Sequence, residues 1–300
     1  MEDDPVSSAR EIIVQNHLHV FGLAILYWDH LITLDAEVQY LWGKSKSYGS
    51  YLFFAVRYGV PASNIPVAVF AFIAVTPSVS SCARHNLIHQ ILLITTQILI
   101  SIIMIQRVYA LYDRSIRLLR WLVAVSACLI ALSVWLLTNQ NSHPLTVLPG
   151  CHTTLSRQTS YHLAGGWGTL LIFDAIIFTL TIFNAYSSRK RLGAQARADM
   201  PLHTLILRDG ALYFAVIAGA NLSNIFTFIF DGPIIPGSLT VFTTCISATM
   251  VSRLNLNIHE NVDADYTNPS EFNMSIFQTQ DVGGVLDPLN AESPDTPLTA

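Results

Sequence analysis

The sequence predicts an all-α integral membrane protein, a bundle of seven transmembrane helices with its N-terminus outside and its C-terminus in the cytoplasm. Three observations lead to this fold class. Hydrophobic residues make up 52% of the 300 residues and charged residues only 12%, whereas soluble domains are about 25% charged. Seven apolar windows reach the roughly 20 residues needed to cross a bilayer core. Lysine and arginine gather in the loops on one side of these windows.

The seven windows are bounded by charged residues, proline or glycine. No backbone polar group can stay unpaired in lipid, so each window is expected to be helical even where β-branched residues are frequent. Pro61 and Pro66 lie inside the second window and predict a kink or a local break. The expected spans are residues 14–34, 51–75, 87–111, 119–138, 163–186, 210–230 and 234–251.

The spans divide the chain into three regions. Residues 1–13 are the expected extracellular N-terminal tail, and residues 14–259 are the membrane domain. The chain begins with acidic residues instead of the positive region of a secretory signal peptide, so the first span is expected to serve as its own insertion signal. Residues 260–300 are acidic and poor in aromatic residues, a composition that cannot offset the entropy cost of ordering. We therefore expect a disordered cytoplasmic tail.

The orientation follows from the positive-inside rule. The loops after spans one, three and five and the flank after span seven hold twelve Lys and Arg residues, and the opposite side holds three. The side with twelve is expected to be cytoplasmic. Its basic residues, such as Arg114, Arg117 and Arg120, are expected to contact the headgroups of membrane lipids. Binding of a cytoplasmic protein partner to these basic inner loops is the alternative.

One stretch of the sequence resembles a known family. Residues 27–42, which read YWDHLITLDAEVQYLW, and the following Arg57 and Tyr58 resemble the start of a fungal, basidiomycete-type family of multi-pass membrane proteins. That family is catalogued as domain of unknown function 6533. The resemblance continues through residues 107–112, 207–213 and 252–260. It implies a seven-helix membrane protein and brings no established activity with it.

Two charged residues fall inside the first two spans. Asp29 and Arg57 each lie about six residues from the inner end of their span, and a rise of about 1.5 Å per residue places them at similar depth. We predict that they pair, because either charge alone would be costly in hydrocarbon. A structural clamp is the simpler role for this pair, and ion or proton handling is the alternative.

Asp174 lies near the middle of the fifth span, distant from any basic residue in the sequence. This position makes it the best candidate for a functional intramembrane acid. The alternative is a polar contact that joins two helices, as polar side chains commonly do in membranes. Asn221 and Asn224, three residues apart on one face of the sixth span, are the expected partners.

Histidine and cysteine offer two further candidate sites. His85 and His89 have the i, i+4 spacing of metal ligands and His19 could join them, but no third ligand is fixed by the sequence. We therefore expect no bound metal and no cofactor; sensing of external pH and solvated histidines without a special role are the alternatives. Cys82 and Cys151 both map to the oxidising outer side and are expected to form a disulfide, with two free thiols as the alternative.

The sequence narrows the function without fixing it. It carries no phosphate-binding loop, nucleophile elbow or kinase signature, so we expect no enzyme, and we expect no nucleic-acid partner. The first hypothesis is a receptor-like or sensory protein with a small-molecule ligand, in the plasma membrane or an endomembrane. A small-solute or proton transporter and a structural membrane protein are the alternatives. Seven helices also resemble G-protein-coupled receptors, but Tyr112-Asp113-Arg114 has the wrong order for their motif, so this analogy concerns the fold alone.

Overall fold

The computed structural model describes residues 5–43, 48–72, 79–138, 142–145, 152–191, 210–230 and 236–267. The chain divides into two compact units, Met1–Asn257 and Ile258–Ala300. The first unit holds the helical bundle and the candidate site. Of the second unit, the structure describes residues 258–267, which are helical.

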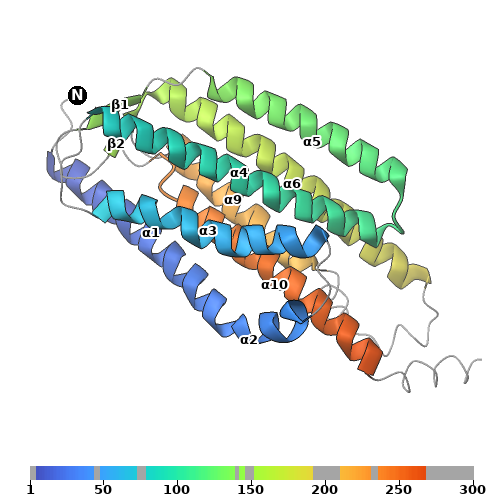
Figure 1. Ribbon diagram of the computed structural model, residues 1–300. Helices are drawn as coiled ribbons and strands as arrows, with labels where there is room; N and C mark the ends of the chain where they lie inside the picture. Colours follow the sequence, from blue (N-terminus) through green and yellow to red (C-terminus); the bar gives the residue numbers. More distant parts are fainter. Residues whose placement is uncertain are drawn as a thin grey trace, which may run out of the picture. The chain divides into compact units, whose positions relative to one another are not determined.

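Long helices make up most of the described residues (Figure 1). Seven of the helices described have at least 20 residues, and each overlaps one expected span. Five of these, within α3, α4, α5, α6 and α9, are long and apolar enough to cross a membrane, whereas α1 and α10 are more polar. The seven are α1 (Pro5–Ile32), α3 (Tyr48–Phe72), α4 (Val79–Leu111), α5 (Ile116–Leu137), α6 (Arg157–Arg191), α9 (Ala211–Phe230) and α10 (Thr240–Thr267).

The connections contain structure that the sequence did not predict. The segment between α1 and α3 forms a short helix α2 (Leu34–Glu37) and a π-helical turn η1 (Val38–Trp42). The segment between α5 and α6 contains an antiparallel hairpin of β1 (Ser142–Leu145) and β2 (His152–Leu155). We term the end of the first unit with this hairpin the hairpin end, and the end with α2 the α2 end (Figure 1).

The structure differs from the sequence analysis at two places in the helices. A kink or a local break was expected at Pro61 and Pro66, and α3 continues through both prolines without a break. Each proline removes one backbone donor. The remaining hydrogen bonds of this long helix and its packing against α4 keep the helix continuous. The disordered tail was expected from residue 260, yet α10 continues to Thr267. Residues 268–300 of the expected tail lie outside the described residues.

Helix α10 is the most enclosed element of the first unit. Its residues between 241 and 256 are largely buried, and many are small or hydroxylated, including Thr243, Ser247 and Ala248. Small residues allow helices to approach closely in a membrane, where apolar area alone does not drive helices together. Helix α10 contacts α1, α4 and α9. Among the other helices, α6 packs against α5 and α9, while α3 packs against α1 and α4.

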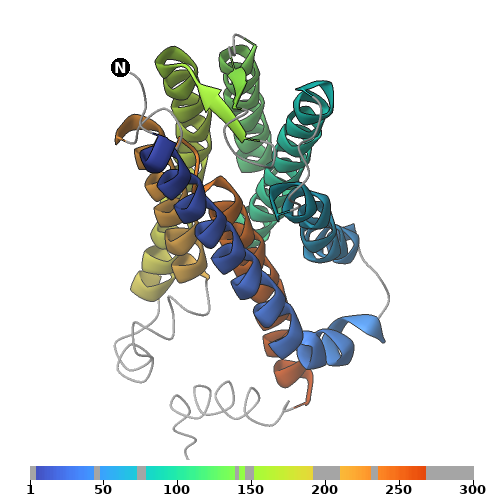
Figure 2. The same cartoon turned by 90° about the vertical axis from the view of Figure 1, so that its left-hand side faces the viewer.

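The first and the last long helix meet at a glycine. A Cβ atom on Gly22 of α1 would lie 2.8 Å from the Cα atom of Phe242 in α10, closer than real Cβ contacts. Beside it, the rings of Phe21 and Phe242 stack with centroids 5.8 Å apart. Glycine is therefore required here by the close approach of two helices, and Figure 2 shows α1 crossing in front of α10.

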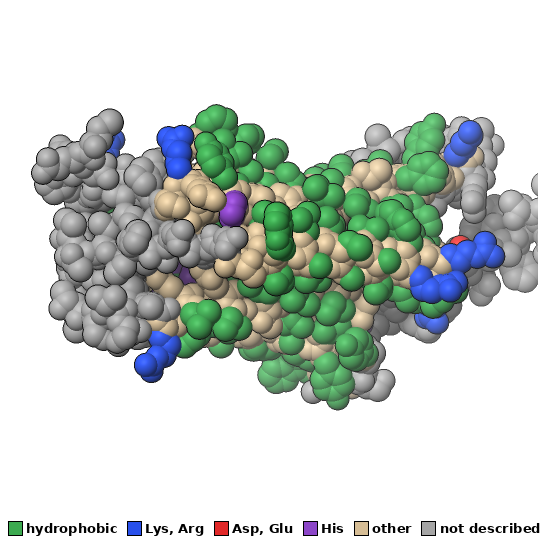
Figure 3. Space-filling view, turned by 90° about the horizontal axis from the view of Figure 1, so that it is seen from above, with side chains coloured by type: hydrophobic (Ala, Val, Ile, Leu, Met, Phe, Trp, Pro, Cys, Tyr) green, Lys and Arg blue, Asp and Glu red, His purple; other side chains and the backbone are tan. Residues whose placement is uncertain are grey.

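The surface of the bundle agrees with a membrane location. On the face drawn in Figure 3, hydrophobic side chains cover the middle, and Lys and Arg gather toward the two ends. Aromatic residues such as Trp28, Trp135 and Phe183 are exposed, which is costly in water over so large an area. These observations, with the five apolar helices, support an integral membrane protein.

Candidate functional site

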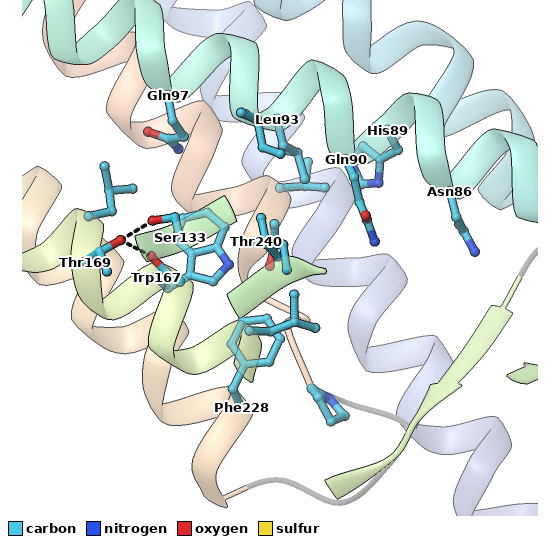
Figure 4. A pocket seen from close by; sticks show the side chains of 18 of the residues that line it. Asn86, His89, Gln90, Leu93, Gln97, Ser133, Trp167, Thr169, Phe228 and Thr240 are labelled. Carbon is cyan, nitrogen blue, oxygen red and sulfur yellow. Dashed lines mark hydrogen bonds between the residues drawn. The ribbon is translucent and has the colours of Figure 1, made fainter. Parts of the chain in front are cut away.

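A cavity of about 410 Å³ lies in the half of the first unit nearer the hairpin end. Figure 4 shows part of its lining from close by. Residues of α1, α3, α4, α5, α6, α9 and α10 line it. Its volume falls within the range of roughly 300–1,000 Å³ that small-molecule sites occupy. Among the described residues, the lining includes no Asp, Glu, Lys or Arg. The cavity is thus suited to an uncharged molecule, because a charged one would find no counter-charge there.

One wall of the cavity is polar. The polar side chains come from α1 and α4, and Figure 4 shows Asn86, His89, Gln90 and Gln97 along α4. The Nε2 atom of His89 is buried and makes no hydrogen bond within the described part of the chain. A buried imidazole nitrogen without a partner is costly, so this wall can gain stability from a ligand that supplies a polar group. The members from α1 are Gln15, Asn16 and His19.

The opposite wall is largely apolar. Helices α5 and α6 contribute branched and aromatic side chains, and Phe228 of α9 adds a ring. A hydrogen bond between the hydroxyls of Ser133 and Thr169 joins α5 to α6 at this wall. The indole of Trp167 also faces the cavity (Figure 4). The apolar members include Leu129, Ile130, Leu163, Leu170 and Phe173.

Toward the α2 end the bundle is densely packed. Met104 and Val108 of α4, Ile177 of α6 and Phe214 of α9 are fully buried, and Leu254 of α10 nearly so. None of these side chains lines the cavity. Within the described residues, the cavity therefore does not continue as a passage through the bundle in this conformation.

Asp174 lies beside the cavity without lining it. The amide of Asn221 in α9 donates a hydrogen bond to the Asp174 carboxylate, and both residues are buried. Asn221 is thus one of the two partners that the sequence indicated. The other, Asn224, accepts a hydrogen bond of 3.4 Å from Thr240 of α10, which lines the cavity. The salt bridges of the described residues do not include Asp174.

The expected pair of Asp29 and Arg57 does not form. The Nε atom of Arg57 lies 2.5 Å from the carboxylate of Glu37, and both side chains are almost inaccessible, at 2% and 0% exposure. Asp29 instead pairs with Arg253 of α10. The reason is that α2, which lies between the first two expected spans, places Glu37 within reach of Arg57.

The Glu37 carboxylate is fully supported by neighbours. Tyr58 donates to it at 2.7 Å and Trp42 at 3.0 Å, in addition to Arg57. Arg57 also donates to Thr33 at 2.7 Å. These five residues form what we term the Glu37 cluster. Burial raises the pKa of Glu37, but the hydrogen bonds from Tyr58, Trp42 and Arg57 outweigh burial and hold this pKa below its ordinary value of 4.5.

The histidine and cysteine candidates have different outcomes. His19, His85 and His89 do line the same cavity, and the rings of His85 and His89 have centroids 6.4 Å apart. In the described part of the chain, however, no three His, Cys, Asp or Glu side chains come close enough to hold a metal ion. The expected disulfide lies outside the described residues, because neither the Cys82 side chain nor Cys151 is described.

Some site residues were missed that a sequence signal could have revealed. Asn86, Gln90 and Gln97 lie at i, i+4 and i+11, which is one face of a helix. Carboxamides on one face of an otherwise apolar helix indicate a polar contact or a cavity. Glu37 and Arg253 had no such signal, because their partners depend on how α2 and α10 pack.

The fold and the cavity define a class: a helical membrane protein with an uncharged, partly polar cavity. A comparison with protein families matches residues 18–62 to a family described as "Family of unknown function (DUF6533)". Comparisons with curated proteins and with solved structures found no match. The matched segment includes all of the Glu37 cluster and Asp29, whereas most cavity residues lie outside it.

Proposed function

We propose that this chain is a receptor-like membrane protein of seven spans, in which the cavity binds a neutral small molecule and the α2 end relays binding to the cytoplasm. The cavity carries the proposal, since it combines ligand-sized volume with uncharged polar groups. The match to a family of unknown function agrees with this proposal and adds no activity to it.

The charge distribution supports an orientation in which the hairpin end is outside. The loops at the α2 end carry most of the Lys and Arg residues. With α1 and α10 counted as spans, both termini follow: the N-terminus lies outside and the C-terminus in the cytoplasm. The cavity then lies in the outer half of the bundle. A fungal origin remains part of this proposal through the resemblance of residues 27–42.

Helix α10 provides a route for the relay. Thr240 and Val241 at its start line the cavity, and Arg253 farther along pairs with Asp29 of α1. At a rise of about 1.5 Å per residue, the two contacts are separated by about 20 Å of helix. A ligand that shifts the start of α10 therefore acts on the Asp29–Arg253 bond, provided that it binds two positions of α10 with different affinity.

A transporter is the second candidate, and Asp174 is the observation that favours it. A buried acid with an amide partner could hold a proton during transport. The densely packed residues between the cavity and the α2 end favour binding of a small molecule over its passage through the bundle. If reconstituted vesicles show solute or proton flux that Asp174→Asn abolishes, transport replaces the receptor proposal.

Photolabelling tests the binding proposal. The protein in lipid nanodiscs is irradiated with a diazirine-bearing long-chain alcohol, and labelled peptides are identified by mass spectrometry. We expect labels on cavity residues of α4 and α6 and their loss in Leu93→Trp/Leu170→Trp, which fills the cavity. Leu132→Trp is the matched control, because Leu132 is exposed and does not line the cavity. Labelling that is equal in the filled variant would refute the proposal.

A distance measurement tests the relay. Nitroxide labels at Arg117 of α5 and Asn257 of α10, both exposed, report movement at the α2 end. We expect the alcohol probe to shift their distance distribution in the wild-type protein and leave it unchanged in the filled variant. If the alcohol probe binds without any shift in this distance distribution, the protein binds a ligand but does not relay its binding, and the receptor part of the proposal is refuted.

A further inference from the structure

We propose that the cavity opens sideways between α4 and α5, so that its ligand is a lipophilic, neutral amphiphile that enters from the bilayer. This inference rests on the proposed function and names the class of ligand. Four apolar side chains carry it. Ile94 and Ile98 of α4 are 40% and 37% exposed, and Ile130 and Val134 of α5 are 43% and 51% exposed. All four also line the cavity.

The four side chains lie at matching depths. Helices α4 and α5 are antiparallel neighbours joined by a short loop, so distance from this loop measures depth on both. At a rise of about 1.5 Å per residue, Ile98 and Ile130 lie about 20 Å from the loop, and Ile94 and Val134 about 26 Å. Each α4 residue thus lies at the same level as one residue of α5, and all four line the same cavity. We term these four residues the lateral mouth.

The lower limit of the opening is also set by a matched pair. Ser101 of α4 and Ser126 of α5 both line the cavity and lie about 15 Å from the same loop. Ser101 already donates to a backbone oxygen of its own helix at 2.8 Å. Below this level Met104 and Val108 are buried. The opening therefore extends from the serines toward the hairpin end.

The aliphatic side chains of the lateral mouth favour the entry of lipophilic molecules from the bilayer. Its four side chains are aliphatic and border lipid, so water-soluble solutes gain nothing by passing between them. A molecule with an alkyl or aromatic body can pass from the acyl chains without leaving an apolar environment. Once inside, its body meets the wall of α5 and α6, and its polar head meets the carboxamides and imidazoles of α4.

The head group is expected to be uncharged and able to hydrogen-bond. The lining described has no Asp, Glu, Lys or Arg, and a charged head would have to lose its hydration without compensation. A hydroxyl, carbonyl or amide fits instead, because Asn86 and Gln90 can both donate and accept. The Nε2 atom of His89 supplies a further buried position for one hydrogen bond.

Quenching by brominated lipid tests the lateral mouth. The protein is reconstituted in phosphatidylcholine with brominated acyl chains, which quench tryptophan on contact. The contribution of Trp167, which lines the cavity, is the difference between wild type and Trp167→Phe. We expect brominated lipid to quench this contribution in the wild type. In Ile98→Phe/Ile130→Phe, which narrows the lateral mouth, the quenching should fall about twofold or more.

A matched variant and a second quencher make the result decisive. Ile91→Phe/Leu132→Phe adds the same bulk to exposed positions of α4 and α5 that do not line the cavity, and it should leave the quenching unchanged. Equal quenching in both double variants would overturn the inference. If acrylamide in water reaches Trp167 and brominated lipid does not, the lateral route is wrong while ligand binding stands. If neither reaches Trp167, the cavity is closed and the proposed function fails with it.

Discussion

The two ends of the bundle differ in the charge and the hydrogen bonding of their buried polar side chains. At the α2 end, Glu37 and Arg57 are charged, buried and surrounded by hydrogen-bond partners. Around the cavity, the polar side chains are uncharged, and the Nε2 atom of His89 makes no hydrogen bond among the described residues. A buried charge needs a partner within the protein. A neutral polar group that is left without a partner until a ligand binds costs less free energy.

This difference separates stability from binding. The Glu37 cluster joins α2 and η1 to α3 at positions within the matched family segment. The cavity lies mainly among helices outside that segment. We therefore expect substitutions in the cluster to act on folding, and substitutions in the cavity to act on ligands. The predictions below test this separation, from the largest expected effect to the smallest.

Glu37→Gln should have the largest effect on stability. It leaves the guanidinium of Arg57 buried without a counter-charge, which typically costs about 3–5 kcal/mol. The free energy of unfolding can be measured by titration with dodecyl sulfate in mixed micelles, followed by circular dichroism. Asp35→Asn is the control, since Asp35 lies on the same short helix and is exposed. Equal losses in the two variants would contradict a special role for the Glu37 cluster.

Acid should remove part of the same stabilisation. Because the pKa of Glu37 is lowered in the folded protein, its contribution is present above its ordinary value of 4.5 and is lost as pH falls through the lower, folded value. The melting temperature of the wild type should thus decline more steeply below pH 4.5 than the melting temperature of Glu37→Gln. Parallel acid profiles for the two proteins would show that Glu37 does not titrate with folding.

Arg253→Ala should have a smaller effect than Glu37→Gln. The Arg253 side chain is 40% exposed while that of Asp29 is 5% exposed, so water can partly replace the lost partner. We expect a loss of about 1 kcal/mol in the same titration. Arg120→Ala, at an exposed position of α5, should cost less. A loss as large as that of Glu37→Gln would mean that the two ion pairs are equally enclosed.

Asn86→Ala should change stability least and binding more. Asn86 lines the cavity and is partly exposed, so its removal should shift the unfolding free energy by less than about 0.5 kcal/mol. Loss of one hydrogen bond to the alcohol probe, worth about 1 kcal/mol, should weaken binding roughly fivefold. Competition in the photolabelling assay measures the affinity. A large loss of stability would place Asn86 in the structural framework instead.

The helices were predictable because solvent decides their position. Long apolar windows must be helical in lipid, and all seven windows overlap a helix of the structure. The small elements were not predictable in this way. The α2 segment is short and contains Asp35 and Glu37, so its composition resembles a loop, and only its packing against α3 makes it a helix that buries a carboxylate.

The candidate site was predicted in part. The pairing of Asp174 with Asn221 followed from the spacing of polar residues on two spans, and the histidines named as a group do border one cavity. The partner of Arg57 was not predicted, because Glu37 lies in the connection between the first two spans and not at matching depth inside a span. A cavity depends on where helices diverge, and a single sequence does not contain that distance.

The contact at Gly22 bears on how the chain is made. It joins the first long helix to the last, whose Phe242 backbone lies too close for any larger side chain. During synthesis α1 emerges more than 200 residues before α10, so the enclosed seat of α10 stays vacant until translation is nearly complete. Until then, the surfaces of the earlier helices that contact α10 lack their partner, and quality-control proteases can act on this incomplete bundle. A ribosome that stalls before residue 240 would leave an open assembly that the cell can recognise and degrade.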